Sequence, residues 1–160
     1  MMKAGNVNQA ARNFAELFSR FEYALKRSGH LAKGREHAEA DWGSFAKELG
    51  PDFYRAVVDS GVAPTLINDP PRKLLRDDLA WGPRRPAPIR NVEELFAIGV
   101  CRVRNSYVHG EKFVGGPDRQ WERDAILVNE ALQVLQLALS QTGLIKDGAT
   151  RRGRGPGRRS

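Results

Sequence analysis

An arginine and a histidine near the end of one apolar segment are the residues of this chain best suited to chemistry. Arg104 and His109 lie in the stretch RVRNSYVHG, which spans residues 102–110. Histidine exchanges a proton near neutral pH and can act as a general acid or base. Arginine can hold a phosphate through two parallel hydrogen bonds. The pair therefore favours acid–base chemistry at a phosphodiester, with Asn105 orienting His109 or contacting the phosphate.

The spacing of these residues limits how they can meet. On an ideal α-helix, Arg104 and His109 point about 140° apart. Asn105 and His109 share a face because they are four residues apart, and so do Arg102 and His109, which are seven apart. Arg104 and His109 converge only if His109 leaves the helix at Gly110 or if two copies of the helix meet. An alternative needs no substrate, because two arginines and a protonated histidine also complement the negative end of a helix dipole.

The element that must position this pair is a helix from Asn91 to about His109. Asn91 and Glu94 resemble a capping box at its start, and Gly110 can end it. Cys101 lies inside it with no adjacent histidine, which predicts a buried, unreactive thiol. The apolar stripe of this helix consists of Val92, Leu95, Phe96, Gly99, Val103 and Tyr107.

Three further segments show helical periodicity. They cover about 9–27, then 41–59 with an interruption at Gly50-Pro51, and about 118–141. Asp41 is a suitable N-cap for the second of them. The last segment carries a heptad-like seam, which is either a core face or a face shared with a second chain. The seam consists of Trp121, Ala125, Val128, Leu132, Leu135 and Leu139. No run alternates convincingly with period two, so we expect an all-α protein without a sheet.

Residues 62–90 contain six of the nine prolines, and such a density breaks long helices. We expect a long, partly irregular connection over the surface, with one short helix around 72–79, and no domain boundary. Trp81 precedes Arg84 and Arg85, a mixture that can contact nucleic acid. A tryptophan packed on the core beside two exposed arginines is the simpler interpretation.

The chain has 160 residues and a net charge of +7. Length and composition favour one helical domain over residues 1–145, followed by a disordered Arg/Gly-rich tail over 146–160. The five arginines of the tail leave a net charge of +2 on residues 1–150. The tail is either a phosphate-binding arm, which salt would weaken, or simply a solvated end.

One cysteine, no visible signal peptide and no apolar run long enough for a membrane span predict a cytoplasmic protein. No phosphate-binding loop or zinc motif is present. His30 and His37 lie near three acidic residues, but no second histidine follows at ligand spacing on one helix. We therefore interpret both histidines as surface polar residues, and we expect neither a metal nor a cofactor.

Residues 104–113 resemble the motif of the HEPN family, in which four to six residues separate an arginine from a histidine and an asparagine often follows the arginine. Arg104, Asn105 and His109 fit its shortest form. The run HGEKF at 109–113 is similar to that of the Apea-like HEPN branch, and FSRFEYAL at 18–25 resembles the first helix of small bacterial members. The resemblance implies an up-and-down bundle of four to five helices that forms a homodimer, with two copies of the motif lining one cleft.

The resemblance also implies a metal-independent endoribonuclease of toxin–antitoxin or phage-defence systems. The 2′-hydroxyl of RNA would attack the adjacent phosphate, with Arg104, His109 and Asn105 as catalytic residues. We expect Arg102, Tyr107 and Lys112 to contact the RNA, and an antitoxin or a neighbouring defence protein to be a further partner. One alternative is an inactive HEPN-like dimer that binds RNA or protein. Another is a helical dimer whose motif only caps a helix.

Overall fold

The computed structural model describes residues 4–74, 81–82, 85–108 and 118–144, and this part of the chain is mostly helical. The mostly helical class expected from the sequence is thus confirmed. The long helices are α1 (Ala4–Arg27), α2 (Trp42–Ser60) and α6 (Asp118–Thr142), and α3 (Pro64–Asn68) is short. A fifth helical stretch over 92–108 changes its winding along its length. Its parts are α4 (Val92–Glu94), the π-helical η1 (Leu95–Val100), α5 (Cys101–Val103) and the π-helical η2 (Arg104–Val108).

The expectation of no sheet is wrong in one place. Two short antiparallel strands, β1 (Lys73–Leu74) and β2 (Trp81–Gly82), pair Lys73 with Gly82 and Leu74 with Trp81. Residues 73–74 are therefore extended where a short helix over 72–79 was expected, and residues 75–80 lie outside the described part of the chain. Pairing between strands satisfies the backbone polar groups of these residues, and such tertiary contacts override a weak helical preference.

Helix caps and breaks follow the local sequence. The Asp41 carboxylate accepts a hydrogen bond from the Ser44 amide at 3.0 Å, so the expected N-cap of α2 is confirmed. Gly50 has a φ of 74° inside α2, and the helix kinks there. Pro51 follows and lacks the amide that would continue the helical bonding, so a glycine before it gives the chain a bend.

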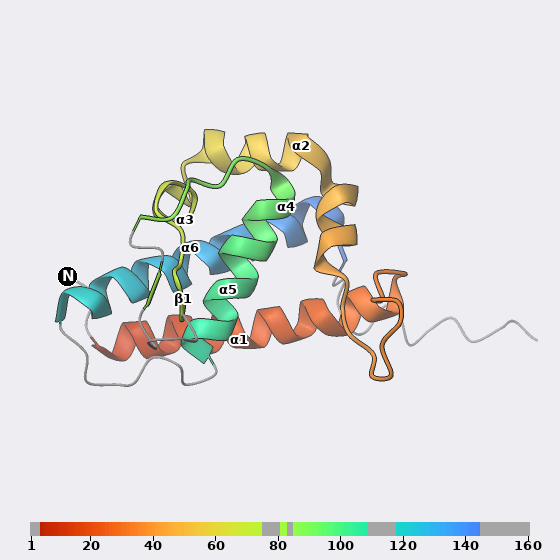
Figure 1. The fold of residues 1–160 in the computed structure, drawn as a ribbon, viewed down its shortest axis with the longest axis horizontal. Coiled ribbons are helices and arrows are strands. Elements are labelled where there is room, and N and C mark those ends of the chain that lie inside the picture. The colour runs from red at the N-terminus through yellow and green to blue at the C-terminus, as the bar shows by residue number, and fades with distance from the viewer. Residues whose placement is uncertain (1–3, 75–80, 83–84, 109–117, 145–160) are drawn as a thin grey trace, which may run out of the picture.

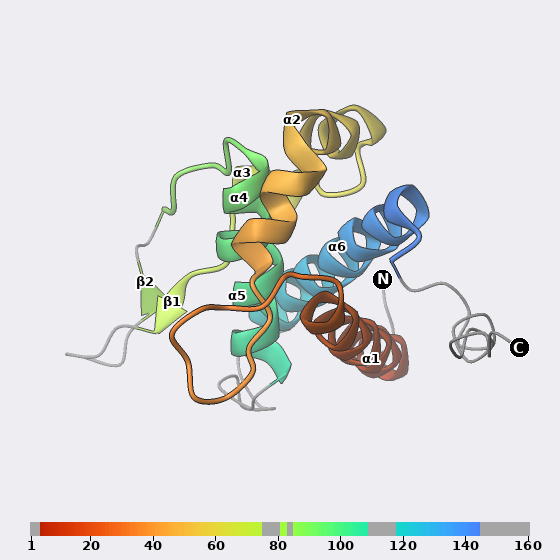
Figure 2. The same cartoon turned by 90° about the vertical axis from the view of Figure 1, so that its right-hand side faces the viewer.

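Figures 1 and 2 show α1 and α6 side by side, with the stretch 92–108 packed across them. The helix α2 lies against α4 at the beginning of that stretch. None of the described helices is long and apolar enough to cross a membrane. The division into one domain and a tail remains a prediction, and residues 145–160 lie outside the described part of the chain.

Aromatic rings from three helices form the centre of the core. The Phe18 ring stacks on Trp42 with centroids 4.7 Å apart, and Trp42 stacks on Phe96 at 5.8 Å. Phe53 stacks on the same Phe96 at 5.9 Å. Because Phe96 comes from η1, these contacts fix the stretch 92–108 against α1 and α2 and so set the position of the residues that follow it.

The seam of the last helix is a core face of this chain. Ala125, Val128, Leu132 and Leu135 are buried, and Leu139 is partly buried against the core. The buried face is also wider than the seam, because positions between the seam residues are equally covered. These additional buried residues are Leu127, Ala131, Val134 and Ala138. The heptad-like spacing therefore needs no second chain to explain it.

Candidate functional site

The stretch that carries the Arg–His motif is not the uniform α-helix that the sequence predicts. It winds as a π-helix over Leu95–Val100 and again over Arg104–Val108. Segments of π-helix are rare and often lie at functional sites. At Gly99 in the first of them, an added Cβ would meet the Ile89 side chain at 3.3 Å and the Leu66 side chain at 3.4 Å. A side chain at this position would press on both neighbours, so glycine suits this close packing.

The guanidinium of Arg104 is held by residues of α1. It lies 5.4 Å from the centroid of the Phe18 ring, and its Nη2 is 4.0 Å from the Glu22 carboxylate. Arg104 also donates to the Asn105 side-chain oxygen at 3.4 Å. All three contacts are long, and the side chain is 32% exposed. A guanidinium has five N–H donors, so Arg104 is oriented by the protein and keeps donors for an anion.

Arg102 faces a different part of the molecule. Its Nη1 donates to the Pro71 carbonyl at 3.0 Å, and burial lowers the pKa of its guanidinium. This contact ties the stretch 92–108 to the proline-rich segment. A contact of Arg102 with substrate remains a prediction, and it would have to use donors that Pro71 leaves free.

Three other expected site residues are not placed by the structure. His109 and Lys112 lie outside the described part of the chain. Tyr107 belongs to η2 by its backbone, and its side chain is not described. Of the six residues, the structure brings together Arg104 and Asn105, which is exposed beside it. The roles of all six remain predictions.

The charges of Glu22 and Arg104, which contact each other near the motif, also affect the pKa of the Cys101 thiol. Burial, followed by the Glu22 carboxylate, raises its pKa to about 12, although Arg104 opposes the increase. A thiol with this pKa is almost wholly protonated at neutral pH, and the thiolate is the reactive form. The structure thus agrees with the expected unreactive thiol.

We expect Cys101 in the native protein to react with iodoacetamide at pH 8 far more slowly than in the urea-unfolded chain. Glu22→Gln removes the carboxylate charge, so the variant should be alkylated faster than wild type while it remains folded. Mass spectrometry follows both reactions, and the single cysteine makes the result unambiguous. Equal rates for native and unfolded protein would contradict the burial of the thiol.

The interpretation of His30 as a surface residue is wrong. His30 is only 8% exposed, its Nδ1 lies 2.6 Å from the Ser44 hydroxyl, and its Nε2 contacts the Glu48 carboxylate. The sequence does not reveal this burial, because the burial depends on how the loop between α1 and α2 folds. A backbone bridge between Leu31 and Ala40 closes that loop. His37, in contrast, is exposed.

Serine, histidine and glutamate are the residue types of a catalytic triad, but their surroundings favour a structural role. The Asp41 carboxylate accepts the Ser44 amide at the start of α2. A negative charge at this position opposes the oxyanion that a serine nucleophile must generate. The backbone of His30 also connects the end of α1 to the start of α2. Its amide donates to the Leu25 carbonyl, and its carbonyl accepts from the Asp41 amide. The cluster fastens the loop between α1 and α2.

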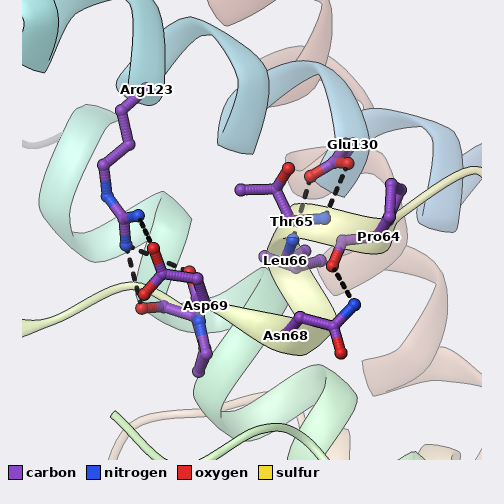
Figure 3. Close-up of polar contacts among 8 residues, drawn as sticks. Pro64, Thr65, Leu66, Asn68, Asp69, Arg123 and Glu130 are labelled. Atoms are coloured by element: carbon purple, nitrogen blue, oxygen red, sulfur yellow. Dashed lines mark hydrogen bonds and ion pairs between the residues drawn. The ribbon is translucent and has the colours of Figure 1, made fainter. Parts of the chain in front are cut away.

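A second polar cluster fastens the proline-rich segment to α6 (Figure 3). Glu130 accepts hydrogen bonds from the amides of Thr65 and Leu66 at 3.0 and 2.9 Å. About two turns before it on α6, Arg123 pairs with the Asp69 carboxylate and donates to the Asp69 carbonyl at 3.0 Å. The only sequence signal for these contacts is an acidic residue, Glu130, within an apolar run of the last helix.

Comparisons with protein-family models, with curated proteins and with solved structures found no match to this chain. The resemblance to the HEPN family therefore depends on the residues of the motif and on the first helix. The family assignment remains a prediction, and the contacts of Arg104 are the structural observations closest to it.

Proposed function

We propose that this protein is a metal-independent endoribonuclease of the HEPN type, acting as a toxin or a phage-defence effector. His109 takes the proton of the attacking 2′-hydroxyl or gives one to the 5′-oxygen that leaves. Arg104 holds the phosphate and stabilises the charge that grows on it in the transition state. Asn105 orients His109 or the phosphate. The products are a 2′,3′-cyclic phosphate and a free 5′-hydroxyl, so no external nucleophile is needed.

The observation that carries this proposal is the π-helical winding of Arg104–Val108. A π-helix forms hydrogen bonds between residues five apart, so positions i and i+5 lie in adjacent turns. Arg104 and His109 are five apart in the sequence. An ideal α-helix separates them by about 140°. The change of winding begins at Arg104 itself, and if it continued to His109 it would bring the guanidinium and the imidazole toward one face, as the chemistry requires.

The contacts of the two arginines weaken the alternative in which they only stabilise a helix end. Arg104 reaches across to Glu22 and Phe18 of α1, and Arg102 reaches Pro71. In the part of the chain that the structure describes, neither guanidinium donates to a carbonyl at the end of its own helix. A long contact with Glu22 also suits a group that exchanges this partner for a phosphate.

A homodimer with two motifs in one cleft completes the proposal, in a HEPN-like arrangement of the helices. Two histidines, one from each protomer, would then divide the roles of acid and base. RNA and an antitoxin or neighbouring defence protein are the proposed partners. The same surface without turnover would be a dimeric RNA- or protein-binding module, which is the competing function.

Incubation of the purified protein with total RNA in EDTA tests the proposal. We expect cleavage that EDTA does not inhibit, with 2′,3′-cyclic phosphate ends detected by mass spectrometry of the fragments. DNA of the same length is the control and should remain intact because it lacks the 2′-hydroxyl. Salt-sensitive RNA binding without any cyclic phosphate would instead identify the binding module.

A further inference from the structure

A pocket of about 410 Å³ lies between the end of α3 and the segment that follows β2. Pockets that hold small ligands range from about 300 to 1,000 Å³, so this one is large enough for a compact ligand. It lies apart from Arg104, which packs on α1. Its walls are formed by Asn68, Asp69, Arg72, Arg85 and Pro86.

The charges in the pocket favour an anion. Arg72 and Arg85 contribute two guanidinium groups, and Asp69 is the single acidic residue among the described residues of the lining. The Asp69 carboxylate is already paired with Arg123 of α6, as Figure 3 shows. Arg123 also donates to the carbonyls of Asp69 and Pro70, so it is held in this position. With the aspartate neutralised, the pocket carries an excess of positive charge.

Arg72 is the residue that distinguishes this pocket from an ordinary basic surface. Its Nε is buried and has no hydrogen-bond partner among the residues that the structure describes. Buried donors are almost always paired, and each exception requires an explanation. The backbone before Arg72 is fixed because Arg102 donates to the Pro71 carbonyl. The guanidinium of Arg72 is thus held at the pocket with one donor that no described residue satisfies.

We infer that this pocket binds a phosphate group through Arg72 and Arg85. A guanidinium presents parallel N–H donors that match two oxygens of a phosphate. Arg85 is exposed and lines the same pocket, so it can contact the remaining oxygens. The phosphate belongs either to a free phosphate ester or to a nucleic-acid strand, because both present the same oxygens. Nothing in this assignment depends on Arg104 or His109.

Titration of the full chain with two probes at 0.15 M salt tests the pocket. The probes are a 5′-mononucleotide and a 2′-O-methyl RNA octamer, which cannot be cleaved by its own 2′-oxygen. In Arg72→Gln/Arg85→Gln we expect the affinity for at least one probe to fall about tenfold or more, because charge-assisted hydrogen bonds are lost. A loss for the mononucleotide identifies a free ester as the ligand, and a loss for the octamer alone identifies a strand.

Two further variants keep the test decisive. Arg55→Gln removes an exposed arginine outside the pocket and should bind both probes like wild type. Arg85→Glu changes an exposed side chain, so it should fold normally and still lose affinity. The tail of residues 151–160 is present in every variant, so its contribution cancels. Unchanged binding of both probes by the double variant and by Arg85→Glu would overturn the inference, whether or not the protein cleaves RNA.

Discussion

RNA cleavage is expected to fall about 100-fold or more when His109 is replaced by alanine, because general acid–base catalysis contributes factors of this size. Arg104→Ala should cause a loss of similar size, since removing one donor that stabilises a developing anion costs about 100-fold or more. Arg104→Lys keeps the charge but loses the paired donors, so it should also be strongly impaired. Initial rates on a labelled RNA oligonucleotide in EDTA measure all three effects.

His37→Ala is the matched control for the histidine, because His37 is exposed and lies outside the motif. It should cleave like wild type. Arg104→Ala also loses the contacts with Phe18 and Glu22, so its thermal melting must be compared with that of wild type before its rate is interpreted. Full activity in the folded His109→Ala protein would reject the catalytic assignment and leave the binding module as the better explanation.

The helices could be predicted because each buries one face at regular spacing. The core positions of α6, such as Val128 and Leu135, follow directly from the periodicity of apolar residues. Capping by Asp41 and by Asn91 was also visible, since both side chains accept the amide three residues later. These signals are local, so they do not depend on which distant segments pack against each helix.

The features that the sequence did not reveal depend on contacts between distant residues. His30 looked exposed because its partners, Ser44 and Glu48, lie beyond a loop whose folding no local pattern specifies. The short helix α3 is preceded by Ala63, which offers no side-chain cap. Glu130, which supplies that cap, lies 65 residues away from Thr65 in the sequence.

The geometry of the candidate site could be predicted only in part for the same reason. Residue types and spacing identified Arg104 and Asn105, but not the change to π-helical winding that begins at Arg104. The winding belongs to a stretch fixed by packing against other helices, as Gly99 shows by its close approach to Leu66. Periodicity counted on an ideal α-helix therefore does not describe the winding of Arg104–Val108.

Replacement of Glu130 by alanine is expected to lower the free energy of unfolding at neutral pH by about 2–4 kcal/mol. The change leaves the buried amide of Leu66 and the partly buried amide of Thr65 without acceptors, and each unpaired donor costs roughly 1–3 kcal/mol. The protein has a stability of about 5–15 kcal/mol if it is typical of its size. Urea unfolding followed by circular dichroism measures the loss, and Glu16→Gln, an exposed change on α1, should stay within about 0.5 kcal/mol of wild type.

The ionisation of Glu130 should also make the free energy of unfolding depend on pH. Burial raises the pKa of Glu130 above its ordinary value of 4.5, and the hydrogen bonds from Thr65 and Leu66 oppose this only in part. The native state then binds the proton more tightly than the unfolded chain, so the contribution of Glu130 to stability decreases as the pH rises from 4.5 through the folded pKa. Glu130→Gln keeps one acceptor and cannot ionise, so it should lose this part of the pH dependence and be less destabilised than Glu130→Ala. If the variant and wild type keep the same slope between pH 4.5 and 7, another group is responsible for it, and Glu130 stabilises α3 without the cost of a buried charge.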